Sequence, residues 1–277
     1  MTLQPVPVFL YHSVSTAPPS WIAPFTISPR VFEEQLDLLA DSGLEVIPLQ
    51  SLVAALQGGP PLPPRPAVLT FDDGFADFHS TVAPLLAARG LPATLYITTG
   101  ALAGPSGPSE RGSLFPPASM LTWRQVSELD AIGVEIGGHT RTHPQLDVLP
   151  WRRAREEIEG CKAQLQDALG HRVDSFAYPH GLSSRSVRRL VRETGWTSAT
   201  AVRYGFSSGA DEPLRIARLM VRADTGRDRF RSWARGAGGP VAPFPEGVPT
   251  RAWRTYRRLR VGINRPYAAL PPPSGTQ

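Results

Sequence analysis

The pattern of apolar and polar positions along the chain predicts strands and helices in alternation. After Ser28, apolar residues recur at helical spacing over 32–39 until Gly43, which is typical of a capped helix. The same reasoning predicts further strands at 44–49, 67–71, 93–98, 134–136 and 174–178, and further helices at about 76–89, 122–129, 151–169 and 184–193. This alternation indicates a parallel sheet, and the number of repeats in one domain favours a barrel over a small open sheet.

Polar residues stand at the ends of several predicted strands. Asp72 and Asp73 end one strand, His139 ends another, and residues 178–180 end a third. Active sites of (β/α) barrels lie at the C-terminal ends of the strands, so we expect these side chains to share one rim. The loop at 99–121, rich in Gly, Pro and Ser, leaves the same rim and is expected to be either a lid or a mobile insertion.

Two adjacent carboxylates, Asp72 and Asp73, follow the apolar run in VLTFDDGF. Like charges side by side repel and are unfavourable to bury unless a cation compensates part of their charge. One aspartate can bind such a cation while the other stays free as a base, and the spacing leaves open which does which. In isolation, Asp-Asp-Gly more often indicates a turn or a helix cap.

His139 and His143 lie four residues apart in GGHTRTHP. Two imidazoles at this spacing can converge on one ion from a helical turn or a tight loop, and Pro144 favours the loop. Alone, the pair is more often surface or core histidine than a metal site. Joined by a carboxylate from a neighbouring strand, the pair forms a ligand set with an open position for water or substrate, as zinc or a similar divalent ion requires.

These segments resemble a known family. TFDDGF, GGHTRTHPQL, FAYPHG and the opening PVPVFLYHSV, in this order and spacing, resemble the polysaccharide deacetylases of the NodB-homology type, carbohydrate esterase family 4. The resemblance covers residues 5–222 and implies a distorted (β/α) barrel that hydrolyses N-acetyl or O-acetyl groups on glycans with a divalent metal. It implies Asp72 as general base, Asp73, His139 and His143 as metal ligands, and Tyr178, Pro179 and His180 on the substrate groove wall, with the His180 backbone N–H helping to bind the oxyanion.

The sequence departs from the family pattern at two points. Many members have a histidine, in a Leu-x-His motif near the last strand, that acts as the general acid. Residues 214–221 (LRIARLMV) contain no histidine. His12, at the end of the first predicted strand, is therefore our first candidate for the general acid. Alternatively, His12 contacts the loop or the substrate at the rim without acting as the acid. His180 is the second candidate for the general acid. Ala177 stands where many members have an arginine that pairs with the base, which leaves the tuning of Asp72 open.

Composition adds a domain division and limits on location. The chain has 277 residues, a net charge of +5 and one cysteine, Cys161, which excludes an internal disulfide. We expect a barrel domain at 1–236, followed at 237–277 by a Pro/Gly linker, a basic amphipathic segment and a disordered tail. The sequence shows neither a membrane span nor a signal peptide. We therefore expect the protein in the cytoplasm or at the inner membrane face, or secreted if a leader was removed.

The basic segment suggests a partner. Residues 251–265 (RAWRTYRRLRVGINR) hold six arginines and no acid, and residues 251–261 are predicted to contact an anionic membrane surface peripherally, with a solvated terminal helix as the alternative. No nucleic-acid-binding motif accompanies the positive charge, so nucleic acid is not expected as a partner.

The function predicted from the sequence is hydrolysis by a metal-dependent N-deacetylase. Its expected substrate is an N-acetylhexosamine-containing glycan or glycan precursor, and its expected cofactor is a divalent metal, zinc first, with cobalt, nickel and manganese as alternatives. A related amidase or deformylase acting on a small or lipid-linked sugar is the runner-up. The missing histidine motivates a second alternative, a catalytically silent glycan-binding homologue.

Overall fold

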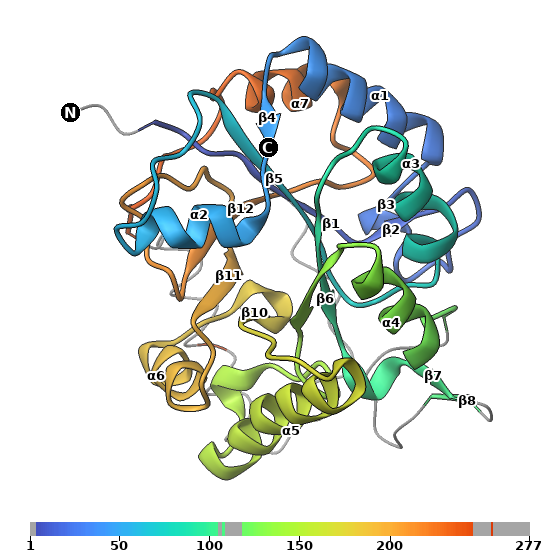
Figure 1. Cartoon of the computed structure of the whole chain (residues 1–277), viewed down its shortest axis with the longest axis vertical. Coiled ribbons are helices and arrows are strands. Elements are labelled where there is room, and N and C mark those ends of the chain that lie inside the picture. Colours follow the sequence, from blue (N-terminus) through green and yellow to red (C-terminus); the bar gives the residue numbers. More distant parts are fainter. Residues whose placement is uncertain (1–3, 105–106, 109–117, 246–255, 257–277) are drawn as a thin grey trace. The chain divides into compact units, whose positions relative to one another are not determined.

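The computed structural model of the chain describes residues 4–104, 107–108, 118–245 and 256 (Figure 1). The chain divides into two compact units, Met1–Pro243 and Phe244–Gln277. Within the first unit, Val241 pairs with Phe206; the predicted domain boundary after residue 236 stays a prediction. Part of the predicted lid at 99–121, and all of the basic segment except Tyr256, lie outside the described residues.

A closed ring of seven parallel strands forms the centre of the first unit. In ring order the strands are β1 (Val8–Tyr11), β12 (Ile216–Met220), β11 (Ser198–Val202), β10 (Ser175–Ala177), β9 (Glu135–Gly138), β6 (Thr94–Ile97) and β5 (Pro66–Phe71), and β1 pairs with β5 to close the ring. The two-residue β4 (Glu45–Val46) pairs with the N-terminal end of β5. The predicted barrel is confirmed. Outside the ring, the described residues form two further strand pairs: β2 (Ser13–Val14) with β3 (Thr26–Ile27), and β7 (Ala103–Gly104) with β8 (Gly107–Pro108).

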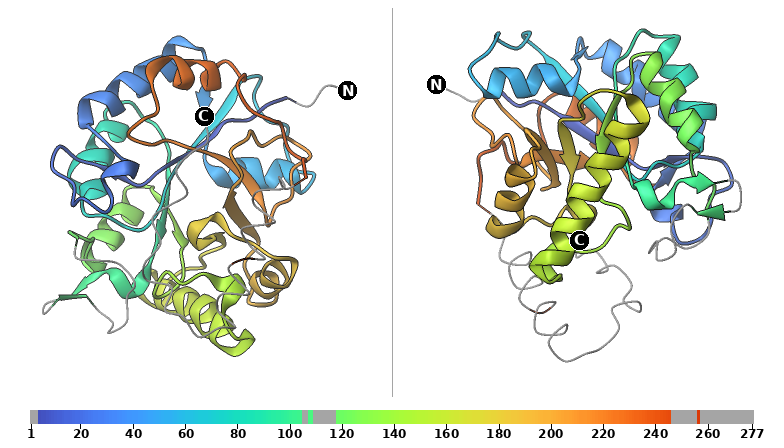
Figure 2. Two further views of the ribbon diagram at one scale, coloured as in Figure 1. Left: turned by 180° about the vertical axis from the view of Figure 1, so that it is seen from behind. Right: turned by 60° about the horizontal axis from the view of Figure 1, so that its bottom comes forward.

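Helices lie around the outside of the barrel (Figures 1 and 2). They are α1 (Pro29–Asp41), α2 (Leu49–Leu56), α3 (Ala83–Ala87), α4 (Trp123–Ala131), α5 (Trp151–Leu169), α6 (Arg185–Glu193) and α7 (Arg227–Ala234). The predicted caps form: the Ser28 hydroxyl accepts the Val31 N–H, and Thr122 and Gln125 make a capping box. Among the described residues, no helix combines the length and the apolar character that a membrane crossing needs.

The structure differs from the predicted elements in several places. Only Glu45 and Val46 of the predicted strand at 44–49 pair with a neighbour, because Pro48 lacks an N–H and instead precedes α2. The predicted helix at 76–89 is shorter and begins with a π-helical turn, Phe78–Val82, before α3. Helices α2 and α7 and strand β11 were not predicted.

Side chains alternate across the barrel wall, as the pleat of each strand requires. Phe9 of β1 stacks on Phe230 of α7 at 4.8 Å between ring centroids, so this side of the strand faces the helices. The neighbouring residue Val8 belongs to a separate buried cluster with Val68 and Tyr96 from the other strands and Leu52 from α2. This end of the interior is therefore packed with apolar side chains, and α2 contributes to it.

Two glycines allow the barrel strands to approach closely beside His139. A Cβ on Gly137 would lie 2.5 Å from the Tyr96 ring and 2.9 Å from the Ser175 carbonyl oxygen. On Gly138, a Cβ would lie 2.4 Å from the Trp196 ring. Because interiors are close-packed, neither neighbour can move without disturbing the strand that leads to His139.

This packing predicts a loss of stability for Gly137→Ala. We expect the free energy of unfolding to fall by about 1–3 kcal/mol, since an added methyl group must displace a buried ring and a backbone carbonyl. Gly209→Ala is the matched control, because nothing lies within 4 Å of the position of its Cβ. Urea unfolding of both variants checks the prediction, and equal stability of the two would contradict it.

Candidate active site

The C-terminal ends of the strands surround a cavity of about 190 Å³. It brings together residues that are distant in the sequence: the polar lining is His12, Asp72, Asp73, His139, His143 and His180, and the larger apolar side chains are Trp21, Ile22, Phe25, Val202 and Met220. His12 follows β1, Asp72 follows β5 and His139 follows β9. The expected common rim is therefore present.

Asp72 is held by an arginine that is distant from it in the sequence. Arg218, on β12, donates from Nη1 to Asp72 Oδ1 at 2.7 Å and from Nη2 to Oδ2 at 2.8 Å. The Arg218 side chain is fully buried, and Asp72 is 3% exposed. Two parallel hydrogen bonds between charged groups fix both the position and the orientation of the carboxylate.

The pair also determines the ionisation of Asp72. Burial alone would raise the pKa of this carboxyl, but the Arg218 guanidinium and then His139 lower it below its ordinary value overall. Asp72 is therefore ionised at neutral pH, as a proton acceptor must be.

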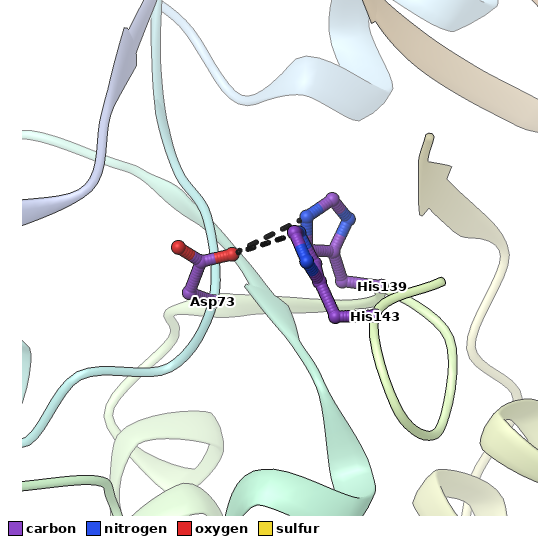
Figure 3. A group of neighbouring side chains, drawn as sticks. All are labelled: Asp73, His139 and His143. Atoms are coloured by element: carbon purple, nitrogen blue, oxygen red, sulfur yellow. Dashed lines mark ion pairs between the residues drawn. The ribbon is translucent and has the colours of Figure 1, made fainter. Parts of the chain in front are cut away.

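Asp73, His139 and His143 form a second cluster within the cavity (Figure 3). The Nε2 atom of His139 lies 3.4 Å from Asp73 Oδ1, and the Nε2 atom of His143 lies 3.5 Å from the same oxygen. Ligand bonds of about 2.0–2.1 Å in a tetrahedron separate neighbouring ligand atoms by about 3.3 Å. The three side chains are thus spaced as ligands of one small cation.

The surroundings of these atoms fit a cation as well. Asp73 Oδ1 is buried and accepts no hydrogen bond within the described part of the chain. The Nδ1 atom of His139 lies 2.8 Å from the Ala177 carbonyl oxygen; donation to that oxygen directs the lone pair of Nε2 towards Asp73. Burial, followed by the charges of His180 and His139, places the pKa of His143 well below its ordinary value. Neutral imidazole is the form that binds metals.

The pKa of His139 shows the opposite balance. Burial alone would lower it, but the nearby Asp72 and Asp73 carboxylates raise it above the ordinary value overall. The two carboxylates therefore favour positive charge at His139 Nε2, and a proton and a metal ion compete for this nitrogen.

The loop that carries the two histidines is held in an unusual backbone conformation. Thr140 and His143 have φ angles of 65° and 63°, and Asp73, which follows β5, has a φ of 81°; residues with a Cβ seldom adopt this region. The Thr140 hydroxyl accepts the N–H of His143 at 3.0 Å. Glu157, on α5, accepts the N–H groups of residues 141 and 142 at 3.0 and 2.8 Å. These bonds hold His143 in a loop, as Pro144 predicts.

His12 and His180 complete the polar lining. The Nδ1 atom of His12 is buried and has no hydrogen-bond partner among the described residues. Burial lowers the pKa of His12, and Asp73 and Asp72 offset part of this effect. His180 is exposed, with its ring centroid 4.6 Å from that of His143 and a φ of 57°.

Tyr178 and Pro179 lie apart from the other predicted site residues. Tyr178 is fully buried, donates its hydroxyl to the Leu214 carbonyl oxygen at 2.9 Å and packs edge-on against Phe176. Pro179 is buried too, and neither residue lines the cavity. Alternation of side chains at the end of β10 turns Tyr178 into the core, so neither side chain forms a wall of this cavity, and their place on a wider substrate groove stays a prediction.

The profile of a protein family described as polysaccharide deacetylase matches residues 59–199. The chain belongs to the polysaccharide deacetylase family. It is thus a hydrolase of acetylated carbohydrate, as the sequence predicted. The matched residues include Asp72, Asp73 and both histidines of the loop.

Other members of the deacetylase family agree with this assignment. The YxkH protein of Bacillus subtilis is 22% identical over 217 residues, which are 78% of this chain and 71% of YxkH. The poly-beta-1,6-N-acetyl-D-glucosamine N-deacetylase of Escherichia coli K12 is 30% identical over 118 residues, 42% of this chain but only 18% of that protein. The solved structure of IcaB from Ammonifex degensii has a TM-score of 0.73 and 26% identity, over 83% of this chain and 97% of IcaB.

Arg218 is the site residue that the sequence analysis missed. The absent arginine at Ala177 left Asp72 without a partner in that analysis, and the replacement comes from a different strand of the deacetylase barrel. One signal was present: an arginine stands inside the apolar run IARLM of β12, where an unpaired charge would be very unfavourable.

Loss of the two-point contact with Asp72 is expected to reduce turnover. Arg218→Lys keeps the positive charge but removes the planar guanidinium that donates two parallel hydrogen bonds. Asp72 should then be misoriented, and kcat should fall about tenfold or more. Arg203→Lys is the control, because it alters another buried arginine–aspartate pair, Arg203 with Asp211 at 3.2 Å. Acetate release per folded molecule checks this; a similar kcat in both variants would contradict it.

Proposed function

We propose that this deacetylase removes N-acetyl groups from an N-acetylhexosamine-containing glycan or glycan precursor in a metal-dependent reaction. Asp72 is the general base, His12 is the general acid, and Asp73, His139 and His143 hold a divalent metal, with zinc as the first candidate. The Tyr178 side chain has no part in this proposal, whereas the backbone N–H of His180 keeps its proposed role as an oxyanion donor.

One observation carries the proposal: the two adjacent carboxylates are compensated in different ways. Both oxygens of Asp72 are engaged by Arg218, whereas Asp73 Oδ1 has two imidazole nitrogens within 3.5 Å and no hydrogen-bond donor in the described chain. A carboxylate bound by a guanidinium stays anionic and well oriented, which suits a base. An oxygen without a donor beside two imidazoles suits a metal ligand.

Each protein group then has a separate task. A bound metal would polarise the acetyl carbonyl and lower the pKa of a nearby water. Asp72 takes a proton from the water that attacks the carbonyl carbon, and Arg218 stabilises the position of that carboxyl group. His12 gives a proton to the departing nitrogen as the C–N bond breaks, because an amide anion is too poor a leaving group. The products are acetate and a free amine.

The substrate part of the proposal rests on the cavity and on the relatives. A cavity of about 190 Å³ accommodates an acetyl group with part of one sugar ring rather than a whole oligosaccharide, and the aromatic rings of Trp21 and Phe25 offer apolar faces to a sugar. The Escherichia coli relative named above acts on poly-N-acetylglucosamine by its name. This favours N-acetylglucosamine units in the substrate of this chain.

Variants of the two aspartates should separate metal binding from turnover. Asp73→Ala and His139→Ala are expected to lose most of the bound metal and most activity, whereas Asp72→Asn should keep the metal and lose about 10²–10⁴-fold in kcat. Metal analysis of the purified proteins and acetate release from N-acetylglucosamine oligomers measure both quantities. Full metal content in Asp73→Ala would refute the ligand assignment. Release of formate from N-formyl sugars at a higher kcat/KM than acetate would instead favour the deformylase.

The role of His12 predicts a dependence on the leaving group. His12→Ala should lose about 10²–10⁴-fold in the rate of amide hydrolysis, the usual contribution of a general acid. Hydrolysis of 4-nitrophenyl acetate should change little, because nitrophenolate leaves without protonation. Assays of both substrates on one preparation check this, and an equal loss on the two would show that His12 acts in another way.

Peripheral contact with an anionic membrane through residues 251–261 remains a separate proposal. Apart from Tyr256, this segment lies outside the described residues. Its support is the arginine-rich, aromatic composition of the segment. Co-sedimentation with anionic liposomes, with and without residues 238–277, tests it.

A further inference from the structure

A second cavity lies away from the active site, between α1 and α7. It has a volume of about 360 Å³ and is lined by Arg65, Arg227, Arg231 and Arg235 together with Leu38, Asp41 and Ser42. Helices α1 and α7 pack against each other (Figures 1 and 2). Four guanidinium groups and one carboxylate give the lining a net charge of +3.

Few of these charges are compensated by the protein. Arg231 pairs with the exposed Asp228 at 3.0 Å, and Arg65 makes a long contact of 3.5 Å with the Ala234 carbonyl oxygen. Arg227 and Arg235 are exposed, and their side chains make no ion pair or hydrogen bond within the described part of the chain. The cavity therefore presents guanidinium groups that are available to a ligand.

The arrangement of the arginines along α7 is unfavourable without an anion. Arg227, Arg231 and Arg235 are spaced by four residues and share one helix face, where like charges repel by about 0.2–0.5 kcal/mol per pair. Arg227 is also the first residue of the helix, where the helix dipole disfavours positive charge. The opposite face of α7 buries Phe230 and Trp233 against the barrel, so packing fixes which residues face the cavity.

This cavity is separate from the acetyl site. Arg65 directly precedes β5, whereas Asp72 directly follows it. Six residues of extended strand span about 20 Å. A group bound among these arginines therefore lies at the other end of the barrel from Asp72 and cannot be the acetyl group that is removed.

We propose that this cavity binds a phosphate-type oxyanion, as the phosphoryl group of a soluble phosphate ester or of an anionic lipid headgroup. Guanidinium groups bind phosphate oxygens in pairs of hydrogen bonds, and the volume leaves room for a phosphate with part of its carrier. The site holds the enzyme on a phosphate-bearing surface or molecule while the other end of the barrel performs catalysis. This inference goes beyond the deacetylase reaction and does not depend on it.

Calorimetric titration with inorganic phosphate tests the site directly. The double variant Arg227→Gln, Arg235→Gln removes two exposed charges and leaves the Arg65 and Arg231 contacts in place. Arg229→Gln is the matched control, because Arg229 is exposed on the same helix and does not line the cavity. The ionic strength is kept constant with chloride in all titrations. We expect wild type and Arg229→Gln to bind phosphate, and the double variant to bind it at least about tenfold more weakly.

A second comparison distinguishes the two sources of phosphate. Binding to phosphatidylcholine vesicles that contain phosphatidate, lost in the double variant and kept in Arg229→Gln, assigns a lipid headgroup. Binding of soluble glycerol 3-phosphate without vesicle binding assigns a soluble ester. No phosphate binding by the wild type, or equal weakening in the double variant and the control, overturns the proposal. Acetate release from a soluble substrate should be unchanged in the double variant, so the outcome is independent of the proposed catalytic roles.

Discussion

The burial of two neighbouring carboxylates at the end of β5 is the constraint on which the active site depends. Asp72 and Asp73 are each 3% exposed, and two uncompensated buried anions would be strongly destabilising. The structure resolves this by giving them different partners. A fixed guanidinium compensates Asp72, whereas Asp73 faces imidazole nitrogens that a cation can join. A chemical asymmetry between adjacent, identical residues follows from their surroundings alone.

The barrel makes this asymmetry possible because it brings strand ends from the whole chain to one rim. Asp72 and Arg218 are 146 residues apart in sequence, yet their side chains meet at hydrogen-bond distance. Gly137 and Gly138 let neighbouring strands and helices approach closely just before His139. The Glu157 carboxylate of α5 holds the following loop by accepting two of its backbone N–H groups. Left-handed backbone angles at Asp73 and His143 are tolerated because this surrounding structure is rigid.

Local patterns predicted much of this architecture, and non-local pairing explains what they missed. Helical spacing and caps predicted α1, α4 and α5, and the short motifs located Asp72, Asp73, His139 and His143. The partner of Asp72 could not be inferred from its neighbours in sequence, since it depends on which strands adjoin in the closed ring. Likewise, the burial of Tyr178 depends on the orientation of β10, and α7 is recognisable only from the barrel surface that Phe230 and Trp233 cover.

When the enzyme is loaded with metal, the two aspartates should keep different partners. A crystal structure of the zinc-loaded protein, with anomalous scattering recorded at the zinc absorption edge, measures this most directly. We expect one anomalous peak within bonding distance of Asp73, His139 and His143, with Asp72 still held by both Arg218 nitrogens. A peak coordinated by Asp72, or an Asp72 carboxylate released from Arg218, would contradict it.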